Sequence, residues 1–188
     1  MKKGFIWALA LAFAGIAVPY AQAEHHVTTV ASESQSPDWK KFHSVSGKCT
    51  IAFPETPEHI KQNMSMPAEE VDLNYDVYVA ADGKDAVYMV LIAEYPDFVD
   101  EAYAELSLES FLNGIVSQHP SNQLVFADLV EVQGFKGLDF FVKTKGVFFK
   151  GRAIMAKNHL YLLAMECEQS NYKDGYFSHF ISSFEMMP

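Results

Sequence analysis

Residues 137–168, GLDFFVKTKGVFFKGRAIMAKNHLYLLAMECE, constrain the fold more than any other stretch of the chain. Their alternating apolar and polar side chains predict three consecutive antiparallel strands, at residues 138–145, 147–157 and 160–168. Gly146 marks the first turn. Asn158 and His159 mark the second turn, where we expect Asn158 to adopt the positive φ of a short hairpin. The last strand is apolar on both faces, which is typical of a strand covered on both sides of its sheet.

Similar patterns predict further strands at residues 42–45, 48–53, 59–66, 71–79, 86–93 and 123–132. Residues 71–79 show the clearest alternation of apolar and polar side chains. Residues 86–93 are almost continuously apolar, so we expect a central strand that pairs with the strand at residues 160–168. The short turns at Ser46-Gly47, Gly146 and Asn158-His159 predict antiparallel hairpins.

Two amphipathic helices complete the predicted fold. The first has Ser107 as its N-cap and an apolar stripe at helical spacing, formed by Leu108, Phe111, Leu112, Ile115, Val116 and His119. The second begins near Asn171, and its stripe is aromatic, formed by Tyr172, Tyr176, Phe177, Phe180, Ile181 and Phe184. The fold class is therefore α+β, with a single antiparallel β-sheet and two amphipathic helices packed on it.

The N-terminal residues have the pattern of an export signal. Lys2 and Lys3 precede the apolar residues 5–18, and Ala21-Gln22-Ala23 fits a cleavage site, so residues 1–23 are a predicted cleavable signal peptide. An uncleaved anchor is the alternative, which this cleavage site disfavours. The polar, Ser-rich residues 24–38 should form a flexible leader, and residues 39–188 a single domain. We expect a periplasmic or secreted protein without an integral membrane span after cleavage.

Charge and motifs exclude several classes of function. The chain has 24 acidic residues against 14 Lys and Arg, a formal net charge of −10, which argues against nucleic acid and anionic lipid as partners. It contains no G-x-S-x-G, no H-E-x-x-H and no Gly-rich phosphate loop. We therefore expect no enzymatic activity and no cofactor.

Cys49 and Cys167 are the two cysteines of the chain, and the strand alternation points both toward the core. In an oxidising compartment they can form a disulfide, which would close a long loop and stabilise the fold. Two separate buried thiols are an equally good interpretation, because the sequence gives no distance between them.

The N-terminus suggests an alternative function. If cleavage follows Ala23, the mature protein begins Glu24-His25-His26. A free amine, two amide nitrogens and a third-position His form a square-planar site that Cu(II) favours, so His25 and His26 predict a periplasmic copper-binding or small-ligand-binding protein. A third-position His also arises by chance.

The longest irregular stretch of the predicted domain, residues 94–105, is the candidate binding surface. In it, aromatic side chains alternate with carboxylates, and the candidate residues are Tyr95, Asp97, Phe98, Asp100, Glu101 and Tyr103. The stretch lacks the ligand spacing of a calcium loop. A protein-docking edge is the functional interpretation, and a solvated connection is the alternative.

Three short motifs, together with the order of the elements, resemble the PsbP-like fold of small α/β sandwiches. They are GKCTIAFPETP at residues 47–57, NHLYLLAME at residues 158–166 and FISSF at residues 180–184. The resemblance extends over about residues 39–184. Members of this fold are mostly non-catalytic, so the resemblance implies an exported binding or accessory module of the bacterial cell envelope that docks a protein partner. No functional residue is carried over by position.

Overall fold

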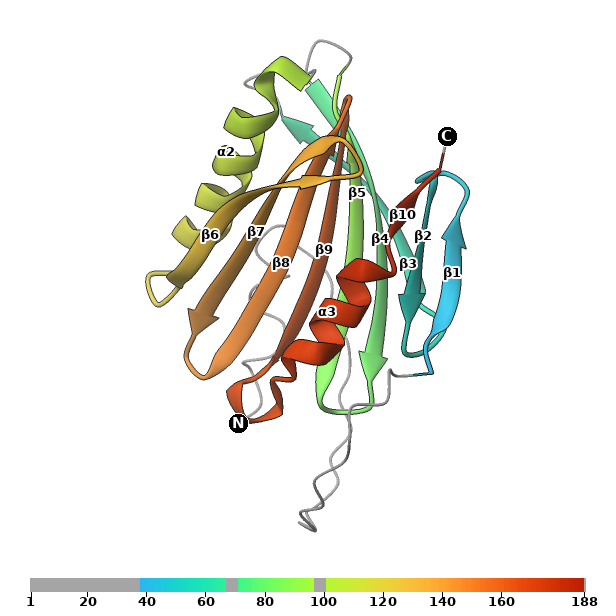
Figure 1. Ribbon diagram of the computed structural model, residues 1–188. Helices are drawn as coiled ribbons and strands as arrows, with labels where there is room; N and C mark the ends of the chain where they lie inside the picture. Colours follow the sequence, from blue (N-terminus) through green and yellow to red (C-terminus); the bar gives the residue numbers. More distant parts are fainter. Residues whose placement is uncertain (1–37, 67–70, 97–100, 188) are drawn as a thin grey trace.

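A seven-stranded antiparallel sheet forms the centre of the computed structural model, which describes residues 38–66, 71–96 and 101–187 (Figure 1). The strand order is β3-β4-β5-β9-β8-β7-β6. The strands are β3 (Glu58–Met66), β4 (Val71–Asp82), β5 (Ala86–Glu94), β6 (Gln123–Val132), β7 (Phe135–Thr144), β8 (Val147–Ala156) and β9 (His159–Glu168). Sequence neighbours are also sheet neighbours except where β9 returns to pair with β5.

The predicted three-strand run is confirmed as β7, β8 and β9, which pair consecutively. The predicted pairing of the central strand is also confirmed, because β5 is antiparallel to β9 with Leu91 opposite Leu162. β9 is buried at every position from Leu160 to Cys167, as its apolar sequence indicates. One detail differs, since the positive φ of the β8–β9 turn falls at Lys157 (55°), one residue before Asn158.

The prediction of a single sheet is wrong. β1 (Lys40–Ser44), β2 (Cys49–Phe53) and β10 (Glu185–Met186) form a separate three-stranded sheet in the order β1-β2-β10. β2 is buried at all five positions, so the N-terminal hairpin lies over the large sheet as a second layer instead of extending its edge. β10 has two residues, too few for an alternating pattern to reveal.

Both predicted helices exist, but their starts differ from the prediction. α2 (Ala104–Ser117) continues directly from the 3-10 helix η1 (Glu101–Tyr103), so it starts before Ser107, and none of the described side chains caps it. α3 (Asp174–Ser182) starts after Asn171, because Asn171 belongs to the 3-10 helix η2 (Gln169–Asn171) and the next residue is extended. In the described ranges, no helix is long and apolar enough to span a membrane.

The two helices bury their apolar stripes on opposite faces of the large sheet. The α2-side face carries one core, which includes Leu108, Leu112, Ile115, Phe140, Phe149 and Leu162. The α3-side face carries another, which includes Ile51, Phe53, Tyr88, Phe177, Phe180 and Phe184. Each fully buried Leu or Phe contributes about 1.5–3 kcal/mol, so these two layers account for the main stabilisation of the fold.

Candidate docking surface

β6 carries several exposed apolar side chains. It is a free edge of the seven-stranded sheet, and Leu124 (46% exposed), Val125 (55%) and Leu129 (53%) lie on it. The described part of the chain has six large apolar side chains that are exposed, so half of them are on this one strand. Apolar side chains gathered in this way are typical of interaction surfaces.

The two faces of β6 have different surroundings. Leu124 and Leu129 lie opposite Val142 and Leu138 of β7, so they belong to the α2-side face, but α2 packs chiefly on β7 and β8. On the other face, the ring of Phe126 contacts Phe141, with ring centroids 6.0 Å apart. The exposure of β6 is therefore confined largely to the side that α2 leaves uncovered.

β6 also lacks the features that protect other strand edges. The edge strand β1 carries Lys40 and Lys41, and the edge strand β3 follows Pro57 and carries Lys61. Lysine and proline discourage the addition of a further strand at such edges. β6, with the sequence QLVFADLVEV, has no Lys, Arg or Pro, and its one irregularity is a bulge between Leu124 and Phe126. Within the described residues, no strand pairs with the outer edge of β6.

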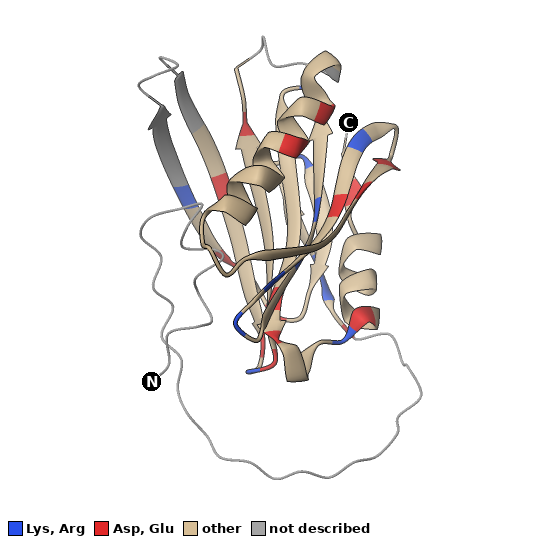
Figure 2. Cartoon of the chain, turned by 90° about the vertical axis from the view of Figure 1, so that its left-hand side faces the viewer, with Lys and Arg blue, Asp and Glu red and all other residues tan. Residues whose placement is uncertain are grey.

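The surface around β6 is acidic. Glu105 and Glu109 on α2 and Asp128 and Glu131 on β6 are all exposed, and Figure 2 shows the acidic bands of α2 on this side. The ammonium group of Lys136 donates to Glu105 over 2.6 Å, which raises the pKa of the lysine. On the α2 side of β6, Glu105, Glu109 and Glu131 outnumber Lys136, so this side is net negative.

Asp128 lies directly opposite another carboxylate, that of Asp139 on β7. The guanidinium of Arg152 makes two hydrogen bonds to Asp139, of 2.6 and 2.7 Å. Arginine in this bidentate geometry neutralises Asp139. Asp128 has no salt-bridge partner in the described part of the chain, so a cation beside it would be favoured.

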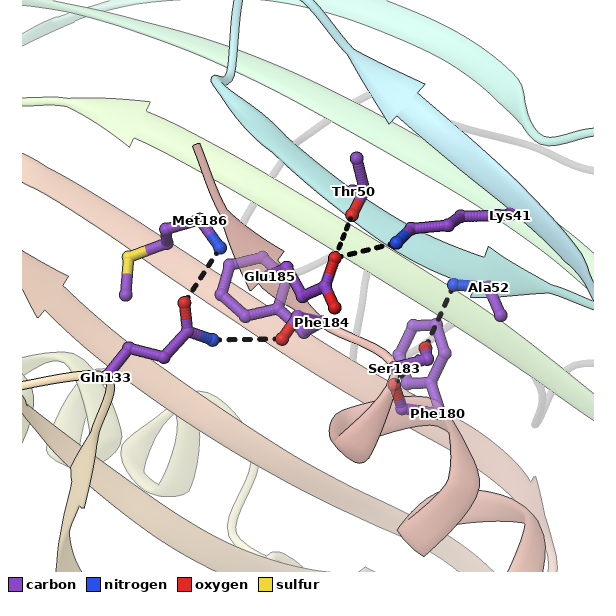
Figure 3. A network of polar contacts seen from close by, with 9 residues as sticks. All are labelled: Lys41, Thr50, Ala52, Gln133, Phe180, Ser183, Phe184, Glu185 and Met186. Carbon is purple, nitrogen blue, oxygen red and sulfur yellow. Dashed lines mark hydrogen bonds and ion pairs between the residues drawn. The ribbon is translucent and has the colours of Figure 1, made fainter. Parts of the chain in front are cut away.

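The edge of β10 is closed, in contrast to that of β6 (Figure 3). The side-chain amide of Gln133, in the β6–β7 turn, donates to the carbonyl of Phe184 and accepts from the backbone N–H of Met186, both over 2.9 Å. On the other side β10 pairs with β2, and Glu185 accepts hydrogen bonds from Lys41 and Thr50. Gln133 thus occupies the backbone groups that a further strand would use.

An aromatic cluster on the α3-side face is also occupied. The ammonium of Lys150 lies 5.0–6.0 Å from the centres of four rings, those of Phe126, Phe141, Tyr172 and Phe177. It donates to the Tyr172 hydroxyl (2.9 Å) and to Asp174 (2.5 Å). The hydrogen bonds that Lys150 and the Tyr172 hydroxyl donate to Asp174 lower the pKa of Asp174. This cluster resembles a cation-binding cage, but a lysine of the chain itself fills it.

The comparisons with known proteins establish the fold and nothing finer. A scan against protein families finds no match, and a search of curated proteins finds none. Among solved structures, the chain is similar to cyanobacterial PsbP (CyanoP) from Synechocystis sp. PCC 6803, with a TM-score of 0.51 and 13% identity over 84% of this chain and 98% of that one. The fold is PsbP-like.

Two further structures are similar to this PsbP-like chain. One is a Bacteroides thetaiotaomicron protein with 10% identity over 80% of this chain and 49% of its own, and a TM-score of 0.43. The other is a Pseudomonas aeruginosa protein of unknown function with 12% identity over 59% of this chain and 85% of its own, and a TM-score of 0.39.

The binding residues predicted in the stretch 94–105 are only partly visible in the PsbP-like domain. Tyr95 is half-buried against the α2-side core, and burial raises its pKa. Its backbone N–H donates to the carbonyl of Asn158 over 2.8 Å. Tyr103 is exposed (55%) at the start of α2. The remaining candidates lie outside the described residues or have undescribed side chains, so this docking site stays a prediction: Asp97, Phe98, Asp100 and Glu101.

Cys49 and Cys167 are free thiols, buried in the same α3-side core. The hydroxyl of Tyr161 on β9 donates to the carbonyl of Gly47, two residues before Cys49, over 3.0 Å, whereas Cys167 is six residues further along β9. Six residues of extended strand span roughly 20 Å, far more than the Cα separation of a disulfide. Burial raises the pKa of Cys49 to about 12 and that of Cys167 to about 11, so both are unreactive thiols at neutral pH.

The metal-binding alternative is not tested by the structure. His25 and His26 lie outside the described residues, so copper binding stays a prediction. Within the described residues, no group of three or more His, Cys, Asp or Glu side chains is placed to hold a metal ion.

The sequence predicted a strand at residues 123–132 but did not identify its exposed apolar side chains as a candidate surface. Leu124, Val125 and Leu129 look like ordinary core residues until the strand order is known. The absence of Lys, Arg and Pro from this stretch is the one signal that could have indicated an open edge.

Proposed function

We propose that the chain is an exported, non-catalytic docking or accessory module of the bacterial cell envelope, which binds a protein partner through β6 and the acidic flank of α2. The observation that carries this proposal is the long, unprotected apolar edge of β6, with Leu124 and Leu129 exposed. Export rests on the signal-peptide pattern of residues 1–23.

An accessory role fits the remaining chemistry better than catalysis does. The cysteine thiols, which are the strongest nucleophiles in the chain, are buried and have raised pKa values. The cation position of the aromatic cluster is filled by Lys150. The PsbP-like fold supports the same role through the resemblance described above, although a fold by itself does not determine function.

The partner is another protein and not a second copy of this chain. β6 carries Asp128 and Glu131 and no basic residue, so two β6 strands paired with each other would oppose only like charges. The net charge of −10 adds a general repulsion between copies. A partner with basic residues would be attracted by the same surface.

Affinity capture from envelope fractions tests the proposal, with the unmodified protein and a Leu124→Ser/Leu129→Ser variant as baits. Both leucines are exposed, so the substitutions should leave the fold intact. We expect a specific protein to be retained by the unmodified bait and lost from the double variant. The matched control is Val45→Ser, because Val45 is the most exposed large apolar residue (78%) and lies on the β1–β2 turn. Equal retention by the unmodified bait and the double variant would refute the proposal.

A further inference from the structure

The free edge of β6 presents backbone hydrogen-bonding groups at defined residues. The β6–β7 hairpin has a two-residue turn, Gln133 (φ 52°) and Gly134 (φ 85°), with Val132 opposite Phe135. In such a hairpin the residues that flank the turn form a hydrogen-bonded pair, and hydrogen-bonded and non-hydrogen-bonded pairs then alternate along the ladder.

This alternation shows which amides point away from β7. Counting back from Val132, the residues at non-hydrogen-bonded positions are Ala127, Leu129 and Glu131, so their N–H and C=O groups point toward the free edge. All three residues are exposed. An extended segment placed beside β6 can therefore form backbone hydrogen bonds at every second residue.

The side chains of β6 specify the chemistry of that segment. Ala127 and Leu129 lie on the α2-side face, and Asp128 between them lies on the other face. In an added strand, the residues opposite Ala127 and Leu129 would be apolar, and the residue opposite Asp128 would be basic because Asp128 lacks a cation. A second basic residue would lie opposite Glu131.

We propose that the partner adds an extended segment to β6 as an antiparallel strand, with a basic residue between two apolar ones and a second basic residue nearby. The proposal deepens the docking function above and rests on it. Strand addition obtains its affinity from backbone hydrogen bonds and its specificity from alternate side chains. The acidic flank, with Glu105 and Glu109, would attract the same basic segment over a longer range.

The probe for this proposal is an acetylated and amidated peptide with Lys-Thr-Val-Lys-Val at its centre, titrated into isotope-labelled full-length protein and followed by NMR. We expect the amides of Ala127, Leu129 and Glu131 to shift and to exchange with solvent at least about tenfold more slowly. The same peptide with Glu in place of both Lys should bind at least about tenfold more weakly at low salt.

Ala127→Pro tests the backbone contribution directly. Proline is tolerated on an edge strand where its missing N–H faced solvent, so the variant should fold and should lose most of the peptide binding. Ala127→Ser, which keeps the N–H, is the matched control and should bind normally. A peptide that is N-methylated at every second amide tests the same backbone hydrogen bonds from the side of the peptide. It should also bind weakly to the unmodified protein.

Three results would overturn strand addition: no binding of the Lys peptide, equal binding of the Lys and Glu peptides, or full binding by a folded Ala127→Pro variant. A concentration-dependent dimer in sedimentation that Ala127→Pro abolishes would also overturn it, in favour of a second copy.

The capture from envelope fractions distinguishes the docking proposal from the strand-addition proposal. If Ala127→Pro retains the partner that Leu124→Ser/Leu129→Ser loses, docking stands and strand addition fails, whereas a bait without any partner refutes both.

Discussion

The two faces of the large sheet are closed to very different extents. The α3-side face is covered by α3 and by the second sheet, and the ring of Phe180 contacts those of Phe53, Tyr88 and Trp39, with centroids 5.2–6.2 Å apart. The α2-side face is covered mainly by one helix and leaves Leu129 exposed on β6. Both faces therefore carry a buried core, but the α2-side face leaves part of β6 uncovered, and this is where we propose that a partner binds.

The α2-side face also contains a carboxyl group without a partner. Glu166 on β9 is 1% exposed and lies between Val87 of β5 and Phe149 of β8. Neither of its carboxyl oxygens has a hydrogen-bond partner among the described residues, and burial raises its pKa to about 8. An unpaired buried carboxyl group is costly, so this face is less optimised for stability than the α3-side face.

The largest effect should come from the α3-side core. Phe180→Ala should lower the free energy of unfolding by about 3–5 kcal/mol, because the side chain is fully buried among other rings. Urea denaturation measures this loss. The matched change on the open side, Leu129→Ala, should stay within about 0.5 kcal/mol. Equal losses in the free energy of unfolding from the two substitutions would contradict the difference between the two faces.

Glu166 should make stability depend on pH. Its folded-state pKa is about 8, above the ordinary 4.5, so between these values the folded protein keeps a proton that the unfolded chain releases. The contribution of Glu166 to stability is therefore greatest below pH 4.5 and is lost as pH rises to 8, by at most about 1.4 kcal/mol per pH unit.

Glu166→Leu removes this titration and should stabilise the protein. The variant should gain a few kcal/mol in the free energy of unfolding near pH 8, and this gain should shrink toward pH 5. Urea denaturation across the pH range measures it. The neighbouring exposed acid gives a control, Glu168→Gln, which should show no such trend. A gain from Glu166→Leu that is the same at both pH values would mean that Glu166 is not buried as an unpaired acid.

A smaller effect is expected at the closed edge of β10. Gln133→Ala removes the hydrogen bonds to the Phe184 carbonyl and the Met186 N–H and should lower the free energy of unfolding by about 1–2 kcal/mol, with faster exchange of the Met186 amide. The same substitution at the other end of β6, Gln123→Ala, is the control and should be nearly neutral because Gln123 is exposed. If the Met186 amide exchanges at the unmodified rate in Gln133→Ala, the side chain does not close that edge.

The smallest effect on stability is expected where the effect on binding is largest. Leu124→Ser and Leu129→Ser should each change the free energy of unfolding by less than about 0.5 kcal/mol, like Val45→Ser. Thermal or urea denaturation of the three variants checks this. A loss of several kcal/mol at either leucine would show that it belongs to the core.

The parts of the fold that the sequence predicts well are those with a repeating apolar pattern. The stripes of both helices, the burial of β9 and its pairing with β5 follow from side-chain spacing, because burial on one face enforces a fixed period. The helix starts were wrong, since η1 runs directly into α2, and extended residues separate η2 from α3.

The candidate site could not be predicted in the same way. Leu124 and Leu129 have the alternation of any half-buried strand, and their exposure depends on the strand order and on how far α2 extends over the sheet. The contact of Gln133 with β10 joins residues that are far apart in the chain, through a two-residue strand without a pattern. Both features are properties of the assembled layers and not of any local segment.

Site-specific photocrosslinking in the cells that naturally produce the protein tests the central claim most directly. A photoreactive residue placed at Leu129 should form a crosslink to one partner protein, and that crosslink should disappear when Ala127→Pro is added. The same residue placed at Val45, which is exposed on the second sheet, should give none. A crosslink from Val45 without one from Leu129 would contradict the account, because it would place the partner away from the open edge of β6.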